Sequence, residues 1–144
     1  MRRGEEGQVT LLIIGFASLC VMAIAMLLDA SAAFLQRQDL DNLADGAALH
    51  GADLGSSGVY DEGIPADRLL QQEQAVRSSV RSYLRDTGAE GRFPGIEVVV
   101  GIDQATRSVT VTLQAPLDLP LTVPGAPKRP IIGASSTAAV TVVD

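Results

Sequence analysis

The feature that most constrains this chain is an apolar segment at residues 9–28, VTLLIIGFASLCVMAIAMLL, which contains no charged side chain. At about 1.5 Å per residue in a helix, its roughly 20 residues are long enough to cross the ~30 Å hydrocarbon core of a bilayer. The hydroxyl groups of Thr10 and Ser18 can bond to carbonyl groups of their own helix, so they do not prevent burial in lipid. The segment therefore predicts a single transmembrane helix.

A cleaved secretory signal is the alternative explanation of the same segment. Such a signal needs an apolar region of about 7–15 residues followed by a small-x-small cleavage site. The sequence Ala30-Ser31-Ala32-Ala33 fits that site. However, the apolar run is longer than a signal requires, and the helical pattern continues through the candidate site.

The basic residues Arg2 and Arg3 precede the apolar segment and predict its orientation. Because basic flanks are retained on the cytoplasmic side, we expect residues 1–8 to form a short cytoplasmic leader. The rest of the chain would then be extracytoplasmic, anchored by one pass through the cytoplasmic membrane.

The composition limits the partners and the size of the folded part. The chain has 144 residues, so about 115 follow the apolar segment, enough for one small domain. A net charge of −6 and an aromatic content of 3% argue against nucleic acid as a partner. The single cysteine, Cys20, lies inside the apolar segment, which excludes a disulfide framework and a thiol metal site.

The stretch at residues 29–54 contains no proline and predicts a helical extension of the membrane segment. Its apolar residues recur at spacings of three and four, which gives one apolar stripe along a helix. That stripe consists of Leu40, Leu43, Ala44, Ala47, Ala48, Gly51 and Leu54. We therefore expect one continuous helix of roughly 65–70 Å, half in lipid and half projecting as a stalk. The Gly- and Ser-rich residues 55–66 are expected to form a linker.

The remaining residues, 67–144, predict a small domain of the α+β class. One amphipathic helix is expected at residues 67–86 and a loop at residues 88–95. Alternation with a period of two predicts strands at 96–102, 108–115 and 131–143, with a bulge near Gly133 in the last strand. Residues 117–123 continue the alternation, but the prolines confine them to a sheet edge or an extended connection. The result is a three- to four-stranded antiparallel sheet, covered on one face by helix 67–86 and with the stalk as a further candidate cover.

Candidate chemical sites are few. His50 could be combined with Asp53 and Ser56 or Ser57, but no nucleophile elbow surrounds either serine. The acidic residues have no calcium-loop spacing. We therefore expect no catalytic, cofactor-binding or metal site and no small-molecule substrate. Asp29, directly after the apolar segment, is either a boundary marker or a partner for a basic group on the helix of a neighbouring subunit.

Residues 3–54 resemble the N-terminal segment of the TadE/TadG-like proteins of Tad (Flp-type) pilus systems. The resemblance rests on Arg3-Gly4, Gly7-Gln8, Asp29, Gln36-Arg37 and the block Ala44-Asp45-Gly46-Ala47-Ala48-Leu49. It implies a pilin-like minor pilin, pseudopilin or assembly protein whose N-terminal helix packs with other pilin-like or Tad assembly subunits. The residues that the resemblance assigns to helix packing are Asp29, Leu40, Leu43, Ala44, Asp45, Ala47, Ala48 and Leu49.

Gly4 and Gly7 are the candidate sites for cleavage by a prepilin-type peptidase. Substrates of this kind usually carry glutamate at the fifth mature position, where this chain has Val9 or Leu12. A processed subunit, found on a cell-surface pilus, and an unprocessed membrane-anchored accessory protein are therefore both open. A membrane-anchored binding or sensory module unrelated to pili is the alternative function, and a membrane-tethered enzyme is the least supported.

Overall fold

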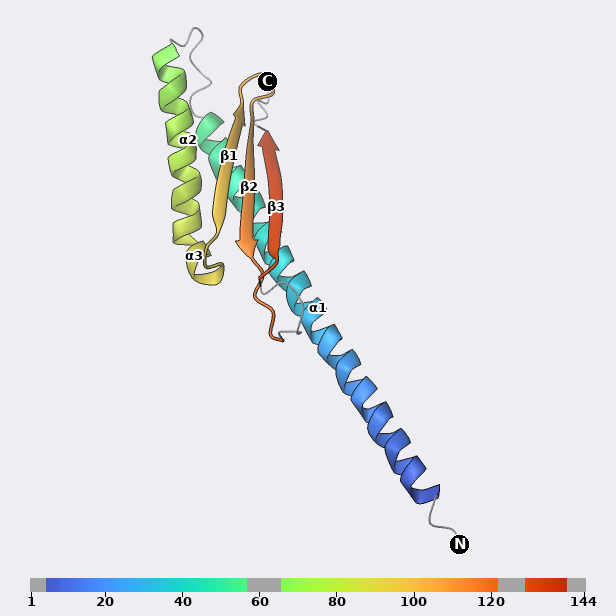
Figure 1. Cartoon of the computed structure of the whole chain (residues 1–144). Helices are drawn as coiled ribbons and strands as arrows, with labels where there is room; N and C mark the ends of the chain where they lie inside the picture. Colours follow the sequence, from blue (N-terminus) through green and yellow to red (C-terminus); the bar gives the residue numbers. More distant parts are fainter. Residues whose placement is uncertain (1–4, 57–65, 122–128, 140–144) are drawn as a thin grey trace.

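The structure, a computed structural model, describes residues 5–56, 66–121 and 129–139. One long helix, α1 (Glu5–Ser56), runs through the whole molecule and carries the rest of the fold at its C-terminal half (Figure 1). The predicted membrane segment and stalk are thus one uninterrupted helix, as the absence of proline and the continuous apolar pattern indicated. Most of the predicted linker, residues 57–65, lies outside the described residues.

Two further helices follow. The helix α2 (Ala66–Asp86) stands beside the C-terminal half of α1, and the short helix α3 (Ala89–Arg92) turns the chain toward the sheet (Figure 1). Residues 88–95 were expected to be a loop, and α3 corrects that expectation. The turn between α2 and α3 passes through Gly88 at a φ of 68°, a left-handed conformation that glycine adopts without a Cβ clash.

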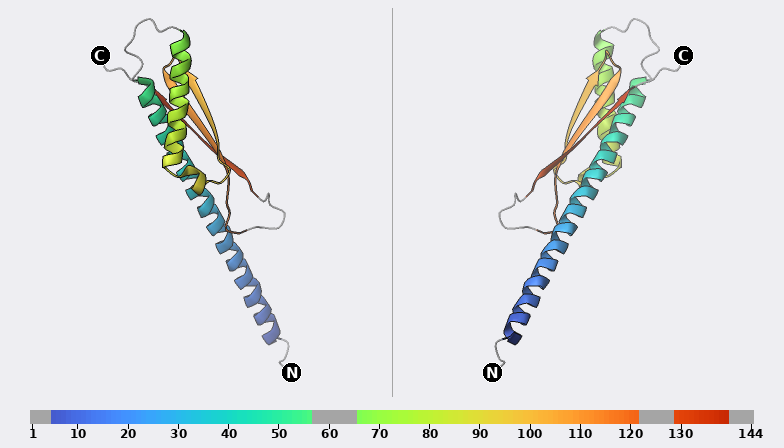
Figure 2. Two further views of the ribbon diagram at one scale, coloured as in Figure 1. Left: turned by 90° about the vertical axis from the view of Figure 1, so that its left-hand side faces the viewer. Right: turned by 90° about the vertical axis from the view of Figure 1, so that its right-hand side faces the viewer.

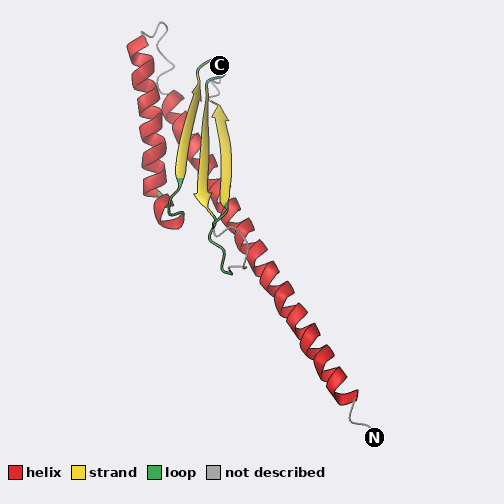
Figure 3. Cartoon of the chain, in the orientation of Figure 1, coloured by secondary structure: helices red, strands yellow, loops and turns green. Residues whose placement is uncertain are grey.

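Three antiparallel strands, β1 (Glu97–Asp103), β2 (Ser108–Pro116) and β3 (Ile131–Ala139), form one sheet in the order β1-β2-β3 (Figure 3). The predicted α+β class and three-stranded sheet are confirmed. The pairing of β2 with β3 continues without interruption through Gly133, so the predicted bulge is wrong. Residues 117–121 form no strand. Residues 140–143 of the predicted last strand lie outside the described residues.

The sheet has one apolar face and one polar face because its strands alternate. Val100, Val111 and Leu113 point into the core, whereas threonine and serine residues take the opposite face. On the polar face, the Thr110 and Thr137 hydroxyl oxygens lie 2.8 Å apart across β2 and β3. Such cross-strand hydroxyl pairs stabilise the register at a face that meets water.

The apolar face of the sheet packs mainly against α1, the stalk that the sequence offered beside helix 67–86 as a candidate cover, and helix 67–86 contacts the sheet at β1. α1 passes behind β2 and β3 in Figure 1, and α2 packs along α1 next to β1. Figure 2 shows from two sides that the sheet and α2 both lie along the C-terminal half of α1 and leave its N-terminal half free. The buried apolar residues of α1, α2 and the strands form one core cluster.

Candidate assembly surface of the long helix

The N-terminal half of α1 is an apolar surface that the described part of the chain does not cover. Its large apolar side chains, from Val9 to Leu28, are each between 57% and 76% exposed. Within the described residues, one helix is long and apolar enough to cross a membrane, and it is this one, at Gly7–Asp53. Exposed apolar area of this extent is unfavourable in water, so lipid or other apolar helices must cover it.

One side of this exposed half is hollowed into a shallow apolar groove. The groove is lined by Ile14, Ala17, Ser18, Val21, Met22 and Ala25. The Ser18 hydroxyl donates to the Ile14 carbonyl oxygen at 2.8 Å, so no unsatisfied donor is presented there. Short side chains at such positions allow the backbone of another helix to approach closely.

Two polar residues of α1 bind the segment that follows β2. A carboxylate oxygen of Asp29 accepts a hydrogen bond from the Leu121 backbone N–H at 3.1 Å. Two turns further along α1, the Gln36 side-chain amide accepts from the Asp118 backbone N–H at 3.0 Å and donates to the Asp118 carbonyl oxygen. Asp29 and Gln36 therefore hold residues 117–121, hereafter the strap, against one face of the helix.

The contacts with the strap give Asp29 a role that the sequence did not predict. Both sequence hypotheses, a boundary marker and a partner for a basic group, overlooked a backbone N–H from a residue 92 positions away. The signal that could have suggested it is the spacing of seven between Asp29 and Gln36, which places both polar side chains on the same face of a helix. That face continues into the apolar stripe at Leu40.

Apart from Asp29, which is half-buried and binds the strap, the residues assigned to helix packing by the resemblance divide into two groups. Leu40, Leu43, Ala44, Ala47 and Ala48 are buried in the core cluster of the chain's own domain. Asp45 and Leu49 are exposed. The side chain of Leu54, which the stripe also included, lies outside the described residues. The buried members of the set therefore pack within the protomer.

Two glycines of α1 explain how closely α2 and the sheet approach the helix. A Cβ at Gly46 would collide with the Tyr83 side chain, lying 2.6 Å from its Cζ atom. A Cβ at Gly51 would lie 3.0 Å from a Val80 methyl carbon and 3.1 Å from a Val109 methyl carbon. Close packing at both positions therefore requires a residue without a side chain. The apolar pattern alone did not reveal this requirement.

The candidate chemical residues form no recognisable catalytic arrangement in the described part of the chain. His50 is exposed and stacks at a tilt on Tyr83, with ring centroids 5.3 Å apart. Ser57 and the side chain of Ser56 lie outside the described residues. Among the residues described, no three histidine, cysteine, aspartate or glutamate side chains gather as a metal site would require. The candidate cleavage residue Gly4 lies outside the described part, and Gly7 lies in the first turns of α1.

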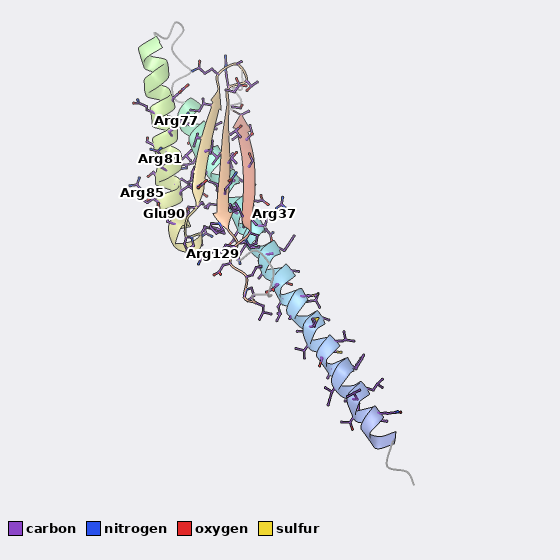
Figure 4. All side chains as sticks on the ribbon, viewed as in Figure 1. Arg37, Arg77, Arg81, Arg85, Glu90 and Arg129 are labelled. Atoms are coloured by element: carbon purple, nitrogen blue, oxygen red, sulfur yellow. The ribbon has the colours of Figure 1, made fainter. Side chains whose placement is uncertain are left out.

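Charged side chains lie on the surface of the domain. Arg77, Arg81 and Arg85 are exposed along α2, on the polar side of this amphipathic helix (Figure 4). Exposed ion pairs join Arg37 to Asp41 at 4.0 Å and Arg92 to Asp39 at 3.8 Å. Pairs of this kind contribute little to stability because water screens them.

The hairpin between β1 and β2 contains a carboxylate with a perturbed pKa. The side chain and backbone of Thr106 and the backbone N–H of Ala105 donate hydrogen bonds that hold the pKa of Asp103 below its usual value. Hydrogen bonds to the charged form favour ionisation, so this carboxylate caps the turn in its ionised state.

Comparison with known proteins bears on the same helix. Residues 7–54 match the family model described as "Putative Flp pilus-assembly TadE/G-like". No curated protein and no solved structure matches the chain. The matched residues contain the exposed half of α1, the two residues that hold the strap and the buried stripe. The resemblance inferred from residues 3–54 is therefore confirmed over residues 7–54, and this part of α1 is similar to the TadE/G-like proteins of Flp pilus assembly.

Proposed function

We propose that the protein is a minor pilin, pseudopilin or assembly protein that acts by packing the exposed half of α1 against the helices of other pilus subunits. A pilus-associated role follows from the family match over residues 7–54. The observation that carries the finer proposal is that the large apolar side chains of residues 9–28 project beyond the domain and have no cover within the described chain.

The physical argument is that lipid and a bundle of helices are equivalent covers for an apolar surface. A helix that leaves the bilayer for a bundle exchanges lipid contacts for side-chain contacts, so the transfer costs little free energy. The groove between Ile14 and Ala25 offers the side for close approach, since Ala17, Ser18 and Ala25 are short. We infer that another subunit's helix lies in this groove.

We further propose that the domain is extracytoplasmic and that the protein has no enzymatic activity. The orientation is supported by Arg2 and Arg3, which lie outside the described residues but belong to the flank that determines topology. The non-enzymatic role is supported by the pilus-assembly family. Fused reporters placed after residue 56 test the orientation, and activity of a cytoplasmic reporter there would overturn it.

The test of helix packing is a pair of matched substitutions in residues 9–28. Ala25→Leu fills the groove, whereas Ala23→Leu adds the same volume two residues away, where the side chain points to the opposite side of the helix. Both changes make the segment more apolar, so membrane insertion is retained in both variants. We expect Ala25→Leu to reduce sheared filaments and Ala23→Leu to leave them at the wild-type level.

Equal filament yield from both variants and the wild type would refute packing through the groove. The intact mass of the protein in membranes and in sheared filaments separates the remaining roles. A mass that lacks the first four or seven residues in the filament fraction supports a processed subunit. A full-length mass confined to membranes supports an assembly protein. Normal filaments after deletion of the gene would favour a binding or sensory module instead.

A further inference from the structure

We propose that the strap (residues 117–121) and the neighbouring turn of α1 form an apolar collar that lies in the headgroup layer of the phospholipid bilayer. The bilayer surface would then be a second partner of the folded domain, in addition to the lipid around residues 9–28. The inference depends on membrane anchoring by that segment and is independent of whether the protein enters a filament.

The depth of the strap follows from its hydrogen bonds to α1. Asp29 is the first charged residue after the apolar segment, so it marks the edge of the hydrocarbon core, and its carboxylate binds the Leu121 N–H. Gln36, which binds Asp118, lies about 10 Å further along the helix at 1.5 Å per residue. The headgroup layer of one leaflet is roughly 5–8 Å thick. The Leu121 end of the strap therefore lies within the headgroup layer, and the Asp118 end lies at its outer edge.

The apolar side chains at this depth surround the helix. Leu121 is 41% exposed on the strap, and Phe34 and Leu35 are 68% and 61% exposed on α1. Phe34 and Leu35 come five and six residues after Asp29, which turns them about 140° and 240° away from it around the helix. The strap thus occupies one side of α1 and the two apolar side chains occupy the other sides.

The strap is suited to the boundary between headgroups and hydrocarbon because most of its backbone donors are satisfied. The N–H groups of Leu117, Asp118 and Leu121 donate to the Pro130 carbonyl, to Gln36 and to Asp29. Pro120 has no N–H to satisfy. Unpaired donors would carry a desolvation cost at the hydrocarbon boundary, so their satisfaction lets the strap lie against that boundary.

The charges at this end of the domain are also compatible with phospholipid. Arg129 and Arg37, of which Arg37 is also paired with Asp41, both lie at the end of the sheet nearest the span, and both are exposed (Figure 4). Arginine at the edge of a bilayer can bind lipid phosphate while its aliphatic part remains in the apolar layer.

Tryptophan fluorescence tests the collar directly because the chain contains no tryptophan. Leu121→Trp and Phe34→Trp place a single reporter in the collar, and Val99→Trp places a matched one at an exposed apolar position on β1. The full chain is reconstituted in nanodiscs with and without phospholipid brominated on its acyl chains. For the two collar variants we expect blue-shifted emission that is quenched by brominated lipid. For Val99→Trp we expect emission that is quenched by aqueous iodide only.

Two outcomes would overturn the proposal. Collar reporters that iodide quenches as strongly as it quenches Val99→Trp would place the strap in water. Collar reporters protected from both quenchers would show that protein covers this surface. Adding Asp29→Ala to Leu121→Trp tests the hydrogen bond, since release of the strap should reduce quenching by lipid.

Discussion

Replacing Leu40 with alanine tests whether the stalk part of α1 belongs to the core of the domain. Leu40 is fully buried where α1 packs on the sheet, whereas Leu49, nine residues later on the same helix, is 64% exposed. Both leucines belong to the segment that matches the pilus-assembly family. Leu49→Ala is therefore a matched control with the same loss of atoms and the same helix.

The two substitutions should differ strongly in their effect on stability. Leucine-to-alanine changes in buried positions cost about 2–5 kcal/mol, from lost burial and the cavity that remains. Changes at exposed positions are usually within about 0.5 kcal/mol. Small domains are stable by only about 5–15 kcal/mol, so Leu40→Ala should remove a large part of the total.

Hydrogen exchange measures this difference in the full chain in nanodiscs. The amides of β2 report on the domain without containing either substitution. A loss of 2–5 kcal/mol corresponds to exchange about 30- to 4,000-fold faster in Leu40→Ala, at tenfold for each 1.4 kcal/mol. Leu49→Ala should change the exchange of β2 by no more than about twofold.

Unchanged exchange of β2 in Leu40→Ala would refute the packing of α1 on the sheet. Equal acceleration in both variants would mean that the leucines stabilise the helix itself and not its contact with the sheet. Either result would contradict the prediction, which depends on Leu40 being buried and Leu49 being exposed.

Three further predictions concern single contacts. Gly46→Ala should lower the melting temperature of the domain, since its Cβ displaces the Tyr83 ring and overpacking costs about 1–3 kcal/mol. Gln36→Ala should speed chymotrypsin cleavage within residues 117–121, because it removes both hydrogen bonds to Asp118. The pKa of Asp103 is lowered on folding, so its ionised carboxylate should stabilise the hairpin. This stabilisation should be complete above the unfolded pKa of about 3.9 and should be lost as the pH falls through the folded pKa. NMR titration of the hairpin amides measures the loss.

Each of these has a control in the same chain. Gly91→Ala adds a Cβ that meets nothing within 4 Å and should not lower the melting temperature. Gln38→Ala changes an exposed glutamine that makes no described contact with the strap, and should leave cleavage at the wild-type rate. Asp103→Asn cannot ionise, so the acid transition of the hairpin should disappear. A wild-type transition in Asp103→Asn would assign it to another group.

Local patterns in the sequence were sufficient to predict most of the elements. The spacing of Leu40, Leu43 and Ala47 predicted the buried stripe of α1, and the alternation of Val109, Val111 and Leu113 predicted the inner face of β2. Both patterns arise within a single element, where backbone geometry alone determines which side chains share a face. The short helix α3 was missed because four residues carry no periodic pattern.

The choice of partners between elements could not be predicted in the same way. Two apolar stripes, one on α1 and one on α2, were available to cover the sheet. Neither sequence pattern indicates which of the two helices packs on it. Gly51 is a physical contribution that the apolar patterns do not contain, since it lets α1 approach Val109 of β2 and Val80 of α2 closely at the same time. The contact of Asp29 with Leu121 likewise joins residues 92 positions apart, and no local pattern connects them.

The division of α1 into two halves determines how mutations in the family segment should be read. A change at a buried position such as Leu40 or Ala47 destabilises the protomer, so loss of filaments there reports on folding. Leu49 belongs to the same block but is exposed on the folded domain, as are the side chains of residues 9–28. Loss of filaments in Leu49→Ala, with the exchange of β2 unchanged, would therefore identify a contact between subunits. Normal filaments in that variant would confine the contacts of α1 with other subunits to the membrane half of the helix.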